Sequence, residues 1–184
     1  MSKVILKPQT FAGTNPALMI SCGTEKHNII TIAWSGIINS IKPMLYISVR
    51  KERYSYDLIE QSGEFVVNLV TKTLLKACDD CGIHSGKNID KFEKWNLTKG
   101  FNTLKTPYIK ESPVNIECKI TDKIELGSHI MFIADIVSLI ADESVMTDGK
   151  IDLKKFDLVC YCGGGYYSLG ERLGNYGFMA TKKV

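Results

Sequence analysis

The sequence lacks a long apolar run, a strong excess of one charge and the glycine motifs of the common nucleotide-binding folds. Without a long apolar run no membrane-spanning helix is predicted, and Lys7 and Pro8 interrupt the N-terminal segment before any signal-like stretch. The 23 basic and 20 acidic residues leave a net charge of only +3, which does not predict a surface for nucleic acid. We therefore expect a cytoplasmic protein with no membrane and no nucleic acid among its partners.

The missing glycine motifs restrict how a nucleotide could bind. No predicted strand leads into G-x-G-x-x-G, which excludes a Rossmann-type dinucleotide domain. The segment from Gly82 to Lys87 has three residues, instead of four, before its Gly-Lys pair, and Asn88 follows it, so it is not a P-loop. Any nicotinamide nucleotide must then bind in the cleft of another cofactor.

The six cysteines can be interpreted either as free thiols or as ligands of a metal ion. In a reducing compartment they are expected to be free thiols that pack as small apolar residues. Cys78 and Cys81 have the spacing of a zinc or redox pair, and Cys160 and Cys162 could supply two more ligands. The second pair has one intervening residue rather than two, so we predict no metal and keep a cysteine-rich metal-binding barrel as a remote alternative.

The apolar residues that are present favour short strands over long helices. Strands are predicted over residues 17–22, 29–35, 44–49, 64–69, 114–120 and 130–139, and the first two should form a hairpin. Short helices are predicted over 56–61 and 73–81, with a turn or two within 87–94. About six strands are typical of a small antiparallel barrel, and we expect residues 1–184 to form one mainly β domain.

Basic residues follow the strand over 44–49 and indicate a phosphate site. Arg50 and Arg53 lie just before Ser55, which is predicted to cap the helix over 56–61, and that helix should stop at Gly63. A helix start offers unpaired amides and a partial positive charge, so an anion there would meet amides, a hydroxyl and cations together. A solvated basic turn is the alternative interpretation of the same residues.

A second glycine-containing segment, residues 81–92, has the composition of a ligand-binding loop. Gly82, Ser85 and Gly86 allow the backbone to approach a ligand closely, and Lys87 adds a cation.

Taken together in their order, these segments resemble the flavin reductase-like proteins of the FMN-binding split-barrel fold, and within them the flavoredoxin branch. The resemblance covers about residues 16–178. It rests on residues 31–35, 47–55, 63–68 and 81–92 and on Gly127-Ser128-His129. Lys42-Pro43 departs from it, because many relatives have two prolines there. The resemblance implies an antiparallel split β-barrel of Greek-key type that binds FMN, forms a homodimer and receives electrons from NAD(P)H or from a redox protein.

The resemblance also implies which residues contact the cofactor. Strand-edge residues would meet the flavin ring and ribityl chain, the turn after them would hold the phosphate, and the glycine loop would close over the flavin. These residues are Thr31, Ala33, Trp34, Ser35, Ser48, Val49, Arg50, Arg53, Tyr54, Ser55, Ser85, Gly86 and Lys87.

Several roles stay open at this point. His84 and His129 could contact a flavin or a nicotinamide, or could simply be surface or packing residues, and Trp34 could equally be a core residue. No general base or nucleophile is predicted. We favour a flavoredoxin-like electron-transfer protein over an NAD(P)H-dependent flavin reductase.

Overall fold

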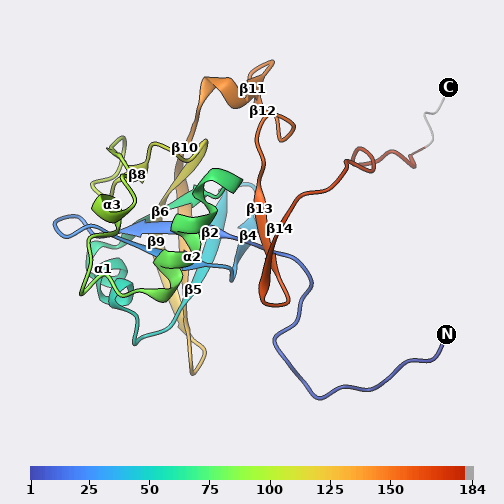
Figure 1. The fold of residues 1–184 in the computed structure, drawn as a ribbon, viewed down its shortest axis with the longest axis horizontal. Helices are drawn as coiled ribbons and strands as arrows, with labels where there is room; N and C mark the ends of the chain where they lie inside the picture. Colours follow the sequence, from blue (N-terminus) through green and yellow to red (C-terminus); the bar gives the residue numbers. More distant parts are fainter. Residues whose placement is uncertain (181–184) are drawn as a thin grey trace.

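The computed structural model describes residues 1–180, and its main feature is one curled antiparallel sheet (Figure 1). Seven strands follow one another across it in the order β3, β2, β6, β9, β10, β5, β4. Their bounds are β2 Leu18–Cys22, β3 Asn28–Ile32, β4 Ser35–Asn39, β5 Met44–Val49, β6 Glu64–Leu69, β9 Val114–Glu125 and β10 Ile130–Ala141. The prediction of a mainly β, antiparallel barrel is confirmed, including the hairpin of β2 with β3.

The predicted strand over 29–35 is in fact two strands, and the break between them explains how the sheet curls. β3 and β4 lie at opposite edges of the sheet, yet only Ala33 and Trp34 separate them along the chain. The two edges must therefore come together, and the Ser48 amide of β5 donates to the Trp34 carbonyl across 2.9 Å at that point. The barrel is split where β3 and β4 diverge.

The helices cover the sheet near this split. The first, α1 (Tyr54–Ser62), ends at Gly63, whose φ of 65° is the left-handed conformation that glycine adopts without strain. The predicted cap at Ser55 is wrong: Arg53 is the N-cap residue and makes no side-chain capping bond, while Ser55 is buried within the first turn.

The next helices also differ from the sequence-based bounds. A 3₁₀ turn, η1 (Lys72–Leu74), precedes α2 (Leu75–Ile83), which continues through Gly82 instead of ending there. A Cβ atom at position 82 would lie 3.2 Å from the Thr31 Cβ, so glycine allows the helix to pack closely on β3. The helix α3 spans only Lys91–Lys94 and is capped by the Asp90 carboxylate.

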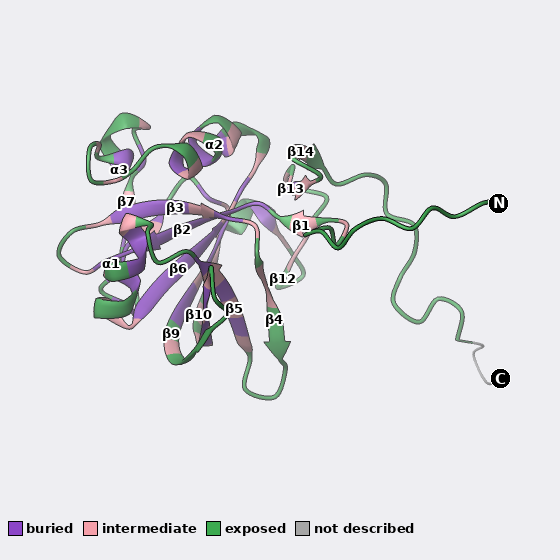
Figure 2. Ribbon diagram, turned by 90° about the horizontal axis from the view of Figure 1, so that it is seen from below, coloured by how far each residue is buried: buried purple, intermediate pink, exposed green. Residues whose placement is uncertain are grey.

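Buried residues, purple in Figure 2, form two apolar cores, one inside the curled sheet and one beneath α2 and α3. Ile47, Phe65 and Phe132 are among the fully buried residues of the first core. Cysteines contribute to both: all six are free thiols, and five are buried. They pack as small apolar residues, as expected from the sequence.

Short strands that were not predicted lie outside the main sheet. β1 (Asn15–Pro16), β13 (Val159–Cys162) and β14 (Gly165–Ser168) form a small sheet of their own, and the tip of the β13–β14 hairpin is Gly163-Gly164. The remaining elements are β7 (Lys99–Gly100), β8 (Tyr108–Ile109), β11 (Met146–Thr147), β12 (Lys150–Ile151) and the 3₁₀ turn η2 (Glu143–Val145). The segment before β1 and the segment after β14, as far as residue 180, extend away from the body on the side of this small sheet (Figure 2). No helix within residues 1–180 is long and apolar enough to cross a bilayer.

The fully buried Glu117 on β9 fastens the loop that follows β7. Its carboxylate accepts hydrogen bonds from the amides of Thr103 and Leu104, each at 3.1 Å, and from Asn102 Nδ2 at 2.9 Å. Burial works against ionisation, but these hydrogen bonds outweigh it and lower the pKa of Glu117.

We expect Glu117→Ala to lower the free energy of unfolding by about 2–4 kcal/mol, because it leaves the buried Leu104 amide and two partly buried donors without an acceptor. Urea denaturation measures the change. Glu143→Ala, at an exposed position on η2, is the control and should change stability by less than about 0.5 kcal/mol. Equal losses in the two variants would contradict this account of Glu117.

Candidate functional site

A cavity of about 740 Å³ opens where the barrel is split. One wall comes from β3, the Ala33-Trp34 link and the turn after β5, and the opposite wall comes from residues 9–13 and the β13–β14 hairpin. Two smaller cavities continue it. One lies beside Ser48 and Arg50, and the other lies between α1 and the loop after α2. Arg53 lines all three, so they form one elongated site.

An aromatic pair stands at one end of the site. The rings of Trp34 and His129 are 4.7 Å apart between centroids and tilted by 40°. Trp34 is 39% exposed, so it lies on the cavity wall and is not a core residue. His129 directly precedes β10, and burial together with the nearby Arg50 guanidinium lowers its pKa, which favours the neutral imidazole. This end offers an aromatic, mostly uncharged surface to a planar ligand.

Unpaired amides and a guanidinium lie at the other end. Arg53 occupies the N-cap position of α1, but its side chain makes no capping hydrogen bond. Among the described residues, the amides of Tyr54 and Ser55 have no hydrogen-bond acceptor. The Arg53 side chain crosses toward α2, where Nη1 lies 3.4 Å from the Gly82 carbonyl. Glu52 also borders this end, but its carboxylate pairs with Arg50 at 3.1 Å. The helix start therefore combines free donors with positive charge, which suits an anion.

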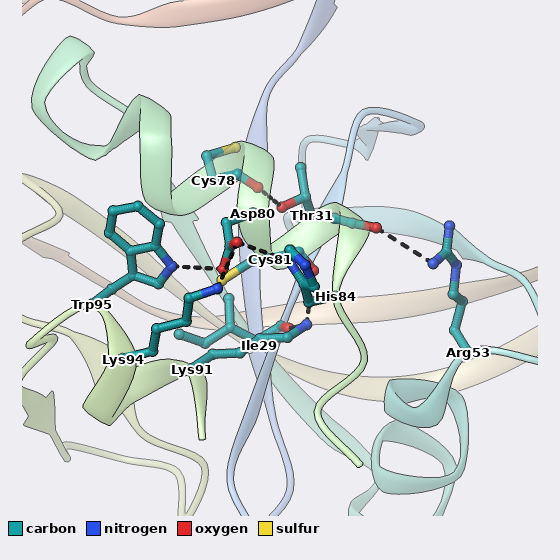
Figure 3. Close-up of polar contacts among 11 residues, drawn as sticks. Ile29, Thr31, Arg53, Cys78, Asp80, Cys81, His84, Lys91, Lys94 and Trp95 are labelled. Carbon is teal, nitrogen blue, oxygen red and sulfur yellow. Dashed lines mark hydrogen bonds and ion pairs between the residues drawn. The ribbon is translucent and has the colours of Figure 1, made fainter. Parts of the chain in front are cut away.

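Lys91 adds a buried cation to the same end. Its side chain is nearly inaccessible, and Nζ donates to the Ile29 carbonyl at 2.6 Å and the Cys81 carbonyl at 2.7 Å (Figure 3). Among residues 1–180 no carboxylate forms an ion pair with it, and burial lowers its pKa. An ammonium uses three donors, and two are occupied, so one remains for a ligand in the small cavity that Lys91 lines.

Asn28 and Gly86 shape the cavity around Lys91. Asn28 is buried at the start of β3 and its Nδ2 donates to Ser55 Oγ at 2.8 Å, which joins β3 to α1. Gly86 packs directly against the Asn28 amide group, and a Cβ atom at position 86 would overlap it. Glycine at this position thus lets the loop after α2 approach β3.

Asp80 organises the loop that carries these residues. Its Oδ1 lies 2.8 Å from Lys94 Nζ and 2.8 Å from His84 Nδ1, and its Oδ2 accepts from Trp95 Nε1 at 2.8 Å (Figure 3). The hydrogen bonds from Lys94 and Trp95 hold the pKa of Asp80 at about 2. Asp80 therefore ties the end of α2 to α3 and fixes the position of His84.

The structure brings most of the predicted site residues together along the elongated site. Those on its cavities are Thr31, Ala33, Trp34, Ser48, Arg50, Arg53, Tyr54, Ser55, Ser85 and Gly86. The Thr31 hydroxyl already donates to the Cys78 carbonyl, and Ser55 faces Asn28, so both hydroxyls are engaged within the protein.

Three predicted residues lie elsewhere. The Val49 side chain is in the barrel core, and Ser35 Oγ donates to the Tyr46 carbonyl on β5 at 2.6 Å and lines none of the three cavities. Lys87 lines a neighbouring open cavity of about 420 Å³. The alternation of the strand explains Val49, because Ser48 and Val49 must point to opposite faces.

The sequence patterns did not indicate Asn28, Lys91 or the wall formed by residues 9–13, and they left the roles of His129 and Tyr166 undecided. Tyr166 stacks edge-on against Tyr161 and donates to Asp79 Oδ1 at 3.0 Å. Burial and the neighbouring Cys78 and Asp79 raise the pKa of Tyr166. Lys91 lies in the segment over 81–92 on which the family resemblance rests, and that was the one available signal for it.

The chemistry of these residues fits a phosphorylated planar ligand. Trp34 and His129 provide an aromatic wall at one end, while Arg53, Lys91 and the first turn of α1 provide cations and free amides at the other. Those groups match, in turn, a ring system and a phosphate monoester.

Comparisons with known proteins agree with this chemistry. The family model described as "flavin reductase like domain" matches residues 12–170. An uncharacterised protein from Archaeoglobus fulgidus is 34% identical over 136 residues, which cover 73% of this chain and 76% of that protein.

Two solved structures are similar over almost the whole chain. Flavoredoxin of Desulfovibrio vulgaris (Miyazaki F) is 33% identical with a TM-score of 0.90, covering 97% of this chain and 99% of that one. Flavoredoxin from Methanosarcina acetivorans is 26% identical with a TM-score of 0.91, covering 98% and 100%. The chain therefore belongs to the flavin reductase-like family, on its flavoredoxin branch.

Proposed function

We propose that this chain is an FMN-binding redox protein that transfers electrons in the manner of a flavoredoxin. The observation that carries the proposal is the phosphate end of the site, where Arg53, Lys91 and the amides at the start of α1 surround a cavity of about 90 Å³. FMN would supply the hydride and single-electron chemistry.

The chain's own residues would bind and orient the cofactor. Trp34 and His129 would contact the ring, Ser48 and Arg50 would border its polar edge, and Arg53 and Lys91 would neutralise the phosphate. The Ser85-Gly86 loop would close the phosphate end, because Gly86 already lies against Asn28. Charge-assisted hydrogen bonds of this kind contribute roughly 1.5–3 kcal/mol each.

A flavin reductase that takes hydride from NAD(P)H is the second candidate, and the large cavity favours it. Beyond Trp34 the cavity continues to Tyr161, Tyr166 and residues 9–13, which leaves space for a second planar ligand beside a flavin. A metal-binding barrel has less support, because no group of three or more His, Cys, Asp and Glu residues in the described part of the chain could hold a metal ion.

Anaerobic stopped-flow spectroscopy separates the carrier from the reductase. The FMN-loaded protein is mixed with NADH or NADPH, and the flavin absorbance is followed. Slow or absent bleaching at physiological nicotinamide concentrations is expected for a carrier. Complete bleaching within seconds would make the protein a reductase.

We also propose that the protein is a homodimer. Large apolar side chains are exposed on the edge strand β4 and the turn after it, namely Ile37, Ile38 and Ile41, and on the N-terminal segment, namely Val4, Ile5 and Phe11. Exposed apolar patches of this kind mark association surfaces. Light scattering at micromolar concentration should report twice the mass of the chain, and a monomer that still holds FMN tightly would contradict the proposal.

A further inference from the structure

His84 lies at the C-terminal end of α2, where it borders the small cavity assigned above to the phosphate. Arg53, Ser85 and Lys91 line the same cavity of about 90 Å³. The electron-transfer proposal gives His84 no role, although the close-up shows it beside Asp80 (Figure 3).

One ring nitrogen of His84 is already used. Its Nδ1 lies 2.8 Å from Asp80 Oδ1, and the Asp80 side chain is only 14% exposed. Lys94 and Trp95 hold the same carboxylate from α3, so its position is fixed from two further directions. An ionised carboxylate only accepts hydrogen bonds, so Nδ1 must carry the proton that it shares with Asp80.

This arrangement determines what the second nitrogen can do. In the neutral imidazole, Nε2 is then an acceptor and offers a lone pair. In the imidazolium, Nε2 becomes a donor and can make a charge-assisted hydrogen bond to an anion. His84 can therefore donate a hydrogen bond to a phosphate oxygen only after Nε2 takes up a proton.

We propose that His84 is a proton-dependent ligand of the phosphate monoester, positioned by Asp80, so that binding of FMN is coupled to protonation of His84. The inference rests on the proposed FMN binding and adds to it a specificity for phosphorylated over unphosphorylated flavin that changes with pH. The affinity for riboflavin, which lacks the phosphate, should not depend on the protonation of His84.

Other charged and titratable groups face the same cavity and must be separated from His84. Glu52, Arg53, Tyr54 and Cys81 line it beside Lys91, and Lys94 approaches His84 through Asp80. Lys91 is the main competitor, because a buried ammonium can also release its proton as the pH rises. The phosphate itself gains its second charge near pH 6 and therefore acts in the opposite direction, strengthening binding as the pH rises.

The test compares wild type with His84→Gln, since glutamine can donate to a phosphate oxygen without taking up a proton. FMN and riboflavin affinities are measured by flavin fluorescence between about pH 6.5 and about pH 8.5, the range above the phosphate ionisation. We expect the affinity of wild type for FMN to fall about three- to tenfold over this range, and that of His84→Gln to stay nearly constant. Riboflavin affinity should be flat in both proteins.

Equal pH dependence in wild type and His84→Gln would overturn the inference, because Lys91 or another group would then be responsible. Lys91→Arg, which keeps a permanent cation at that position, is the second variant, and it should retain the pH dependence of wild type. Loss of the dependence in Lys91→Arg would likewise overturn the role of His84. Failure of wild type to bind FMN at any pH is a different result and would refute the proposed function itself.

Discussion

Replacing Lys91 by methionine is expected to lower the affinity for FMN by about 100-fold or more, while riboflavin affinity changes by less than about fivefold. Among residues 1–180 no carboxylate forms an ion pair with this buried ammonium, so its charge is available to a phosphate in the small cavity that Lys91 lines. Charge pairs in such surroundings are worth far more than exposed ones. Fluorescence titration with the two flavins measures both affinities.

The stability of the protein without flavin provides an internal check on Lys91→Met. Methionine removes the cost of burying an ammonium but leaves the Ile29 and Cys81 carbonyls without their donor, and these effects oppose each other. The unfolding midpoint should therefore move little. Lys76→Met, at an exposed position on α2, is the control and should change neither flavin affinity nor stability. Parallel losses of FMN and riboflavin binding would exclude a phosphate contact.

Arg53→Gln should give the second largest effect, lowering FMN affinity roughly 10- to 100-fold and reducing the salt dependence of binding. Arg53 lines every cavity of the site and stands directly before the free amides of α1. The side chain is exposed, so its contribution should be smaller than that of Lys91 and more strongly screened by salt.

Lys51→Gln provides a matched control within the same turn. Lys51 also carries a single positive charge, but its Nζ pairs with Glu125 at 3.0 Å, away from the cavities. Its loss should change FMN affinity by less than about threefold. If both substitutions weakened FMN binding equally, the effect would arise from net charge, and the assignment of Arg53 to the phosphate would be wrong.

Local sequence patterns predicted the strands of the main sheet except β4, but they did not predict how the sheet closes. The strands over 44–49 and 64–69 have the predicted bounds, because each is a largely apolar run between polar turns. The run over 29–35 looks equally continuous, and only the meeting of the two sheet edges at Ala33-Trp34 divides it. That division depends on the whole sheet and has no local signal.

The candidate site residues likewise divide into those with a local sequence signal and those that depend on the tertiary fold. Arg50 and Arg53 were predicted because they follow a strand and precede a helix, which is a local pattern. Lys91 contacts Ile29, which is 62 residues away in the sequence, and Asn28 contacts Ser55 across 27 residues. Contacts over such separations depend on how α2 and α3 pack on β3. Ser35 and Val49 were included because the resemblance implied them, but strand alternation points Ser48 and Val49 to opposite faces and places the Val49 side chain in the barrel core.

Titration of the flavin-free protein with FMN and with riboflavin tests the central claim most directly. The account predicts one FMN per chain and an affinity at least about 100-fold higher than that for riboflavin, because Lys91, Arg53 and the amides of α1 act only on the phosphate. Equal affinities for the two flavins, or no binding of either, would contradict it.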